Sequence, residues 1–248
     1  MNLQMPMGDS MAPLKAQVCT VLFSLLFESV LAGEVTGEST NQMIRQVGPG
    51  EFAMGNLKFD KKRRTVTFPI TLNQAQGSME YLLVTSHGKI HESIFRTDTK
   101  PEEIHIAMLL LGATGAGTNS IPGSVEGPIS NPSKEIIHGN PVALSVKWML
   151  NGKEVERPAE QLIFNEQTRS TPQPGNWVYN GSVVWQGKFM AQLEGSISSL
   201  ITDQTALINN IASGHDNDQV WTVNTNSLPP ADLELKMTIR LEERSKGE

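Results

Sequence analysis

Alternation of apolar and polar residues is the feature of this sequence that most limits its fold. The clearest example lies near the C-terminal end, where apolar side chains occupy every second position: Leu233, Leu235, Met237, Ile239 and Leu241. The same period of two runs through residues 66–72 and 142–148. Successive side chains of a strand point to opposite faces, so this pattern is typical of strands with one buried face. The sequence therefore predicts a protein built mainly from strands.

A β-hairpin is predicted over residues 80–95, where two apolar segments flank His87-Gly88. Glycine tolerates the positive φ that a two-residue turn requires, so the two strands are expected to pair antiparallel around this turn. In that register Glu92 lies opposite Leu83, among apolar neighbours.

A helix is predicted to follow the hairpin, over about residues 100–111. Thr99 and Glu102 have the spacing of a capping box, and Pro101 falls in the first turn, where a missing N–H costs nothing. Gly112 is a suitable C-terminal cap. Because apolar residues occur nearly all round this helix, we expect it to be buried.

A second, short helix is predicted over about residues 204–212, begun by Thr202 or Asp203. Between the two helices, residues 113–141 form a long segment rich in Gly, Pro and Ser without periodicity, which indicates a loop. Strands outnumber helices too heavily for a doubly wound parallel fold. The expected fold class is therefore α+β, a mostly antiparallel sheet or sandwich with one buried helix and one minor helix.

Residues 1–32 are typical of a signal peptide. Lys15 precedes an apolar run over residues 18–27, and the small residues ending at Ala32 suit a signal peptidase. A signal peptide cleaved after Ala32 would direct export of the protein to the periplasm, the cell envelope or the extracellular space. An uncleaved anchor is the alternative, whereas cleavage would leave no stable membrane span.

Residues 33–50 are predicted to be a flexible leader, and residues 51–243 a single domain. Cys19 is the only cysteine and lies within the expected signal peptide, so the mature protein would have neither a disulfide nor a thiolate ligand. A net charge of −6 argues against nucleic acid as a partner. The basic run over residues 61–64 is expected to be a solvated turn.

Most of the residues able to do chemistry lie between residues 80 and 105. Glu80, His91, Glu92 and His105 include carboxylates and imidazoles, which suit a divalent metal or an acid and base pair. Glu92 and His105 are the candidate metal ligands in that alternative, although no recognised metal-binding spacing is present. The structural alternative is that Glu92 and His105 are buried polar groups satisfied by one another or by the backbone. In either case we expect the two side chains to form one polar contact at the base of a pocket.

Further along the chain, aromatic residues gather in the second half: Trp148, Trp177, Tyr179, Trp185 and Trp221. Such a row, if exposed, could stack on a sugar ring or a peptide, although large rings on strands more often anchor a core. The acidic segment 215–218 lacks the glycine and the distal glutamate of a calcium loop, so we interpret it as a solvated loop. No motif makes Ser93 or Ser182 a nucleophile.

One stretch contains Glu80, Gly88-Lys89 and His91-Glu92-Ser93 and is followed by a predicted helix with the sequence HIAMLLLG from His105. This stretch resembles the signature of the YdjY domain family of secreted bacterial proteins. The similarity extends over about residues 59–240 and includes Glu194-Gly195. It adds Lys89 and Ser93 to the candidate ligand or polar network, beside Glu80, His91, Glu92 and His105. The resemblance implies no established activity.

Three functions remain open. The leading hypothesis is an exported, non-catalytic binding or accessory module for an envelope ligand, a sugar or a protein, without a cofactor. The first alternative is a metal-dependent enzyme or metal-binding protein that uses the region from Glu80 to His105. The second alternative is a structural component of the envelope.

Overall fold

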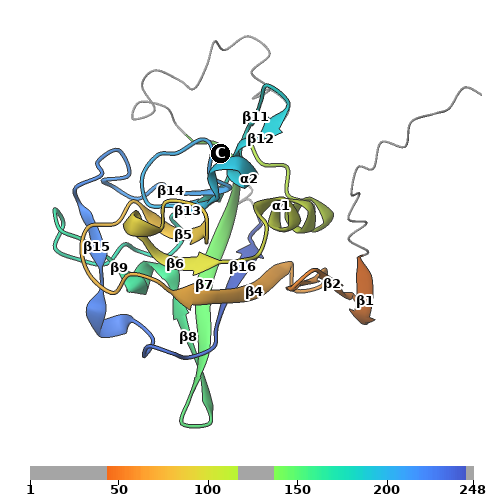
Figure 1. The fold of residues 1–248 in the computed structure, drawn as a ribbon, viewed down its shortest axis with the longest axis horizontal. Helices are drawn as coiled ribbons and strands as arrows, with labels where there is room; N and C mark the ends of the chain where they lie inside the picture. Colours follow the sequence, from red (N-terminus) through yellow and green to blue (C-terminus); the bar gives the residue numbers. More distant parts are fainter. Residues whose placement is uncertain (1–43, 117–136, 244–248) are drawn as a thin grey trace, which may run out of the picture. The chain divides into compact units, whose positions relative to one another are not determined.

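A computed structural model describes residues 44–116 and 137–243, so the expected signal peptide and most of the 113–141 loop lie outside the described residues. Eight strands close into a barrel, because the last strand pairs back onto the first (Figure 1). Around the barrel they are β4 (Thr65–Leu72), β16 (Leu235–Leu241), β7 (Asn140–Leu150), β10 (Trp177–Tyr179), β14 (Ile208–Asn210), β13 (Ser196–Ser199), β5 (Tyr81–Thr85) and β6 (Ser93–Thr97). The expected α+β sheet or sandwich is therefore wrong, and the fold is a mostly β closed barrel.

The alternating segments form the strands that they predict. β16 pairs antiparallel with β4 on one side and β7 on the other. Its apolar residues Leu235, Met237, Ile239 and Leu241 are buried, while the residues between them are exposed or half-buried. Period-two patterning thus places one face of each strand in the core.

Two neighbouring pairs in the barrel are parallel, and this overturns the expected hairpin. β5 and β6 run in the same direction, with Tyr81 opposite Ser93 and Leu83 opposite Phe95. Residues 86–92, including the 3-10 helix η1 (Ile90–Glu92), carry the chain back to the start of β5. The side chain of Asn73 holds this return connection by donating to the carbonyl groups of Ile90 and Ser93. β13 and β14 are likewise parallel and joined by a short return connection, residues 200–207.

The predicted first helix exists as α1 (Pro101–Leu110), with Pro101 at its first position. It is not covered on all sides, because Leu109 and Leu110 are 47% and 42% exposed. Thr99 does not cap it; its hydroxyl donates to Asn56 Oδ1 at 2.8 Å.

The predicted helix over residues 204–212 is wrong. That segment forms a turn and then strand β14. A short helix, α2 (Met190–Glu194), lies instead before β13 and contacts α1 (Figure 1).

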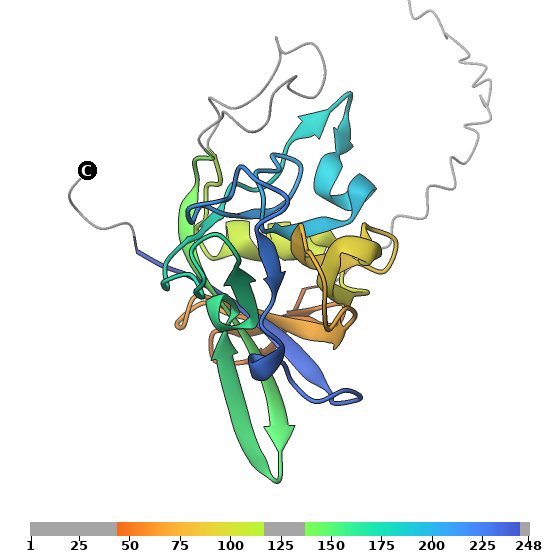
Figure 2. The ribbon, with the colours of Figure 1, turned by 90° about the vertical axis from the view of Figure 1, so that its left-hand side faces the viewer.

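Strands outside the barrel extend it at several places. β1 (Arg45–Gly48), β2 (Glu51–Met54) and β3 (Leu57–Asp60) continue the sheet from β4, and β1 lies within the range expected as a flexible leader. β8 (Lys153–Pro158) pairs with β7, and the two strands leave the barrel as a long hairpin (Figure 2). The remaining elements are the pair β9 (Ile163–Asn165) and β15 (Trp221–Val223), the pair β11 (Val184–Trp185) and β12 (Lys188–Phe189), and the 3-10 helices η4 (Ala159–Leu162) and η5 (Thr225–Ser227).

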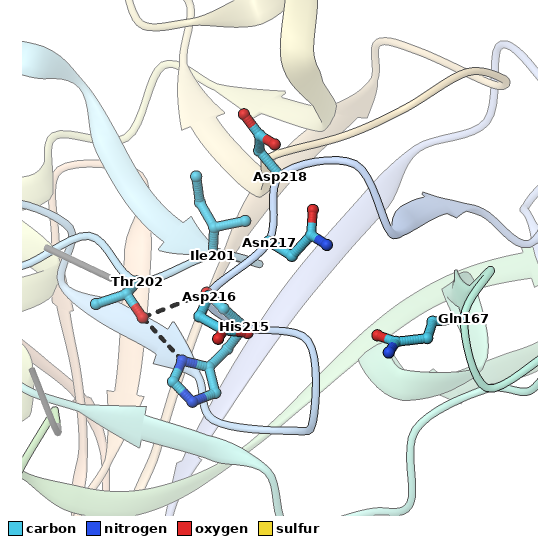
Figure 3. A pocket seen from close by; sticks show the side chains of 7 residues that line it. All are labelled: Gln167, Ile201, Thr202, His215, Asp216, Asn217 and Asp218. Atoms are coloured by element: carbon cyan, nitrogen blue, oxygen red, sulfur yellow. Dashed lines mark hydrogen bonds between the residues drawn. The ribbon is translucent and has the colours of Figure 1, made fainter. Parts of the chain in front are cut away.

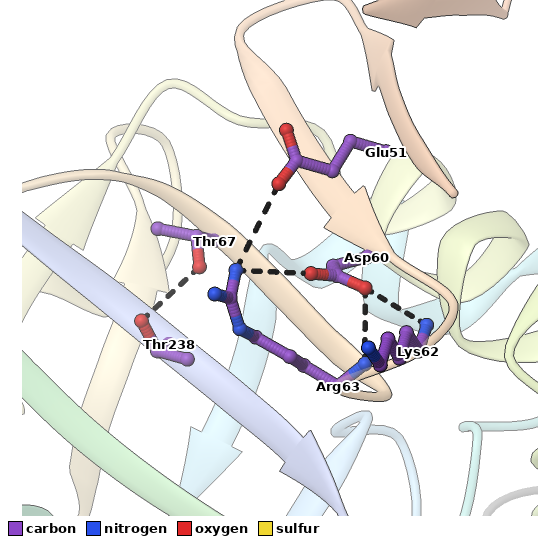
Figure 4. A network of polar contacts seen from close by, with 6 residues as sticks. All are labelled: Glu51, Asp60, Lys62, Arg63, Thr67 and Thr238. Carbon is purple, nitrogen blue, oxygen red and sulfur yellow. Dashed lines mark hydrogen bonds and ion pairs between the residues drawn. The ribbon is translucent and has the colours of Figure 1, made fainter. Parts of the chain in front are cut away.

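The basic run forms the turn between β3 and β4, as predicted. Arg63 Nη1 lies 3.2 Å from Asp60 Oδ2 and 3.7 Å from Glu51 Oε1 (Figure 4). The backbone N–H groups of Lys62 and Arg63 also donate to Asp60. The Arg63 N–H is the main cause that lowers the pKa of Asp60, so this carboxylate closes the turn as an anion.

The aromatic row is mostly core. Trp177, Tyr179 and Trp221 are fully buried and Trp148 is 5% exposed, whereas Trp185 on β11 is 37% exposed. The core interpretation is therefore confirmed for four of the five rings, and a continuous stacking platform is not formed.

Candidate functional site

Tyr81 lies where the two return connections meet. Lys89, in the connection between β5 and β6, donates from Nζ to the Tyr81 hydroxyl oxygen at 3.0 Å. The Tyr81 hydroxyl donates in turn to Asp203 Oδ2, in the connection between β13 and β14, also at 3.0 Å. Burial of the ring and the neighbouring Asp203 charge raise the pKa of Tyr81, so the phenol stays protonated and keeps donating.

Asp203 continues this line of polar contacts toward α2. Its Oδ1 accepts from the backbone N–H of Thr205 at 2.8 Å and lies 2.6 Å from the Thr205 hydroxyl. The same hydroxyl lies 2.8 Å from Glu194 Oε2. Because the Thr205 hydroxyl has a single proton, it donates to either Asp203 or Glu194 at any one time. The network that runs from Lys89 through Tyr81, Asp203 and Thr205 to Glu194 therefore joins residues 81–89 to residues 194–205, more than a hundred positions later.

Glu80 and Glu92 form an acidic pair beside this network. The backbone N–H of Glu80 donates to the carbonyl oxygen of Glu92 at 3.0 Å, which sets the two residues side by side just before β5 and β6. Burial is the first cause that raises the pKa of Glu80, and the Glu92 charge is the second. On its outer side Glu92 Oε1 lies 3.1 Å from His91 Nε2.

An open pocket of about 500 Å³ adjoins the acidic pair. Its lining residues are Gln167, Ile201, Thr202, His215, Asp216, Asn217 and Asp218 (Figure 3). Thr202 fixes the wall, because its hydroxyl lies 2.8 Å from His215 Nδ1 and its backbone N–H donates to the His215 carbonyl at 2.7 Å. Asp218 is close enough to Glu80 to contribute to its raised pKa. The lining holds two carboxylates and neither lysine nor arginine.

Two glycines allow the return connection of residues 86–92 to approach the C-terminal end of α2. Gly195 has φ +73°, and a Cβ added there would meet the Thr85 hydroxyl and lie 2.9 Å from Gly88 Cα. A Cβ added to Gly88 would lie 3.1 Å from the Gly195 carbonyl oxygen. Residues Gly88 and Gly195, which both belong to the resemblance noted above, thus pack backbone against backbone at the end of β5.

His105 belongs to a separate site. Its Nδ1 lies 2.7 Å from the Tyr179 hydroxyl, and its ring packs 4.9 Å from the ring of Phe189 on β12. Burial lowers the pKa of His105 and raises that of Tyr179, so both groups are neutral at pH 7.

The structure therefore brings together Glu80, Lys89, His91 and Glu92 but not the other two candidates. Ser93 is buried in β6 and donates to the Phe95 carbonyl at 2.7 Å. Among the described residues Glu92 pairs with His91 and His105 with Tyr179, and the expected contact between Glu92 and His105 is not found.

The metal-binding alternative gains no support from this geometry. Within residues 44–116 and 137–243, no group of three or more His, Cys, Asp or Glu side chains is arranged to hold a metal ion.

Reasoning from the sequence missed Asp203, Thr205 and the pocket. Asp203-Gln204-Thr205 carries a usable signal, because an Asp side chain commonly accepts from the N–H two residues later and so marks a turn rather than a helix. The sequence predicts a solvated loop over residues 215–218, and no local pattern indicates that Thr202 anchors this loop as a pocket wall.

In the part of the chain that is described, no helix is both long enough and apolar enough to cross a membrane.

No curated protein and no solved structure is significantly similar to the chain. The model of one family, the YdjY domain, matches residues 57–240. This range contains the barrel apart from its last residue, Leu241, together with both return connections and the pocket. The chain belongs to the YdjY domain family.

Proposed function

We propose that this protein is an exported, non-catalytic binding module that holds a small, hydroxyl-rich ligand carrying an amine, such as an amino sugar. The observation that carries this proposal is the open pocket next to Glu80, with Asp216 and Asp218 in its lining. Two carboxylates without a lysine or arginine beside them favour a cationic group on the ligand.

The other lining groups suit the hydroxyls of such a ligand. The Asn217 and Gln167 amides and the Thr202 hydroxyl can each donate to or accept from a sugar hydroxyl. Ile201 supplies an apolar surface for the carbon face of the ring. A few polar groups that fix orientation around an apolar contact are common in small-molecule sites.

The polar network beside the pocket supports binding rather than catalysis. Lys89 and Tyr81 are engaged with each other and with Asp203, and the raised pKa of Tyr81 makes it a poor base at neutral pH. These residues hold the two return connections together and so keep the pocket wall in place. Export is proposed from the sequence, on the apolar run that follows Lys15 and the cleavage site at Ala32.

Calorimetric titration of the mature protein with glucosamine and with glucose tests this function. We expect glucosamine to bind and glucose to bind at least tenfold more weakly, because only the former carries an ammonium group. Asp216→Asn and Asp218→Asn should each weaken glucosamine binding while the melting temperature stays the same. Glu234→Gln removes an exposed carboxylate just before β16 and is the matched control.

Two results would count against the proposal. One is that glucosamine does not bind at millimolar concentration. The other is that Asp218→Asn and the Glu234→Gln control bind it equally well.

A further inference from the structure

Glu80 and Glu92 occupy a place where two negative charges are costly. They are neighbours across the start of a parallel strand pair, held there by the 3.0 Å hydrogen bond from Glu80 N–H to the Glu92 carbonyl. The Glu80 carbonyl is itself fixed, because it accepts from Leu200 N–H at 2.8 Å and from the Ser199 hydroxyl at 3.3 Å. The backbone thus sets the two residues side by side, and their carboxyl groups lie within hydrogen-bonding reach, so that a shared proton relieves their repulsion.

The charged groups around the pair leave most of this repulsion in place. From the return connection, Lys89 lowers the pKa of Glu80, but its ammonium group is already bonded to Tyr81. From η1, His91 pairs with the outer oxygen of Glu92. From the pocket loop, Asp218 adds a third negative charge that raises the pKa of Glu80.

Asp203, in the connection between β13 and β14, is a further charged group on an element packed against the pair. It accepts the proton of the Tyr81 hydroxyl. The net effect on Glu80 is a raised pKa, with burial as the largest cause and Glu92 as the second.

We propose that the Glu80–Glu92 pair is an acid-strengthened latch on the return connection of residues 86–92. When the pair holds one proton, one carboxyl donates to the other and ties η1 to the residue that precedes β5. When both are ionised, the hydrogen bond is lost and the two charges repel each other. The latch therefore closes in acid and loosens at neutral pH, whether or not the pocket binds a ligand.

The direction of the pH dependence follows from linkage. A carboxyl whose pKa is raised in the folded state binds its proton more tightly there than in the unfolded chain. Its contribution to stability is therefore full below its unfolded pKa, near the ordinary value of 4.5, and is lost as the pH rises through the folded pKa.

The test is thermal unfolding of the wild type, Glu80→Gln and Glu92→Gln between pH 4.5 and pH 7.5, without added ligand. A glutamine amide donates as the protonated carboxyl does, so each variant imitates the closed latch at all pH values. We expect the melting temperature of Glu80→Gln to exceed that of the wild type by roughly 2 °C or more at pH 7.5, and the gap to close at pH 4.5. Glu234→Gln, the exposed control, should follow the wild type throughout.

Hydrogen exchange supplies a local measurement. Amides in residues 86–92 of the wild type should gain protection, after correction for intrinsic rates, as the pH falls, and those of Glu80→Gln should not. The proposal is overturned if both glutamine variants melt below the wild type by the same amount at every pH, or if protection in this connection is independent of pH in the wild type. If Glu80→Gln does not fold, Glu92→Gln alone decides by the same criteria.

Discussion

Removal of one hydroxyl group, by Tyr81→Phe, tests whether the network between the return connections stabilises the fold. Tyr81 is 2% exposed, and its hydroxyl accepts from Lys89 and donates to Asp203, each at 3.0 Å. A hydrogen bond to a charged group contributes about 1.5–3 kcal/mol, but Lys89 is exposed and Asp203 still accepts from the backbone N–H of Thr205. We therefore expect a loss of about 1–3 kcal/mol in the free energy of unfolding at pH 7.

Urea unfolding followed by fluorescence measures this loss, and Tyr179→Phe is the matched comparison. The Tyr179 hydroxyl forms a hydrogen bond with the neutral ring of His105 at 2.7 Å rather than with a charged group, so its removal should cost about 1 kcal/mol. A double-mutant cycle of Tyr81→Phe with Asp203→Asn should show clear coupling, because the two residues share one hydrogen bond. A Tyr81→Phe loss below that of Tyr179→Phe, or strict additivity in the cycle, would refute the reasoning.

Three further predictions concern single positions. Gly195→Ala should destabilise the protein more than Gly187→Ala: φ is +73° and +74° at the two sites, but only at Gly195 would the added methyl group meet neighbouring atoms. Chemical denaturation of both variants measures the difference in the free energy of unfolding, and equal losses would contradict the steric argument. Glu160 is 4% exposed, and burial raises the pKa of its carboxyl group, so Glu160→Gln should raise the melting temperature more at pH 7 than at pH 4. The glutamine side chain can still accept from Gly175 N–H, and a lower melting temperature at pH 7 would contradict this prediction. An NMR pH series should give His105 a pKa below the ordinary value of 6.5, and a pKa above 6.5 would be inconsistent with its burial. The contribution of neutral His105 to stability is present above pH 6.5 and should be lost as the pH falls through the lowered pKa.

The parts of the fold that sequence patterns predicted are those that local chemistry determines. The alternation from Leu235 to Leu241 gives β16, and Pro101 marks the start of α1. Each signal lies within the element that it predicts, so no distant residue is needed to interpret it. The same holds for the turn that contains Arg63, which Asp60 closes from three residues away.

The direction of β6 could not be predicted in this way. Period-two patterning identifies a strand and its buried face but is the same for a parallel and an antiparallel partner. The return connection depends on Asn73, which lies 17 residues before Ile90 and 20 before Ser93. A turn residue such as Gly88 was consistent with a hairpin, although its structural role is the close approach to Gly195.

The mistaken helix at residues 204–212 has a similar cause. Leu207, Ile208 and Ile211 have helical spacing, and a short apolar run does not distinguish helix from strand. Asn209 decides the outcome, because its side chain bonds Asn180 and the backbone of Asp203 and so fixes β14 beside its connection.

For the candidate site, the sequence placed Glu80, Lys89, His91 and Glu92 in one neighbourhood, because they lie within a few residues of two paired strands. The partners that complete the site are Gln167 and residues within 194–218, all at least 75 positions further along the chain than Glu92. Their approach is a property of the closed barrel, in which β5 and β13 are neighbours.

The central claim, that the pocket beside Glu80 is the binding site for an amine-bearing, hydroxyl-rich ligand, is tested most directly by an NMR titration of the mature, ¹⁵N-labelled protein with glucosamine. We predict that the amide signals of Thr202 and of residues 215–218 shift first and saturate together, and that Asp218→Asn moves this saturation to a higher glucosamine concentration. Shifts confined to the surroundings of His105, or shifts in the pocket that glucose reproduces at the same concentration, would contradict the claim.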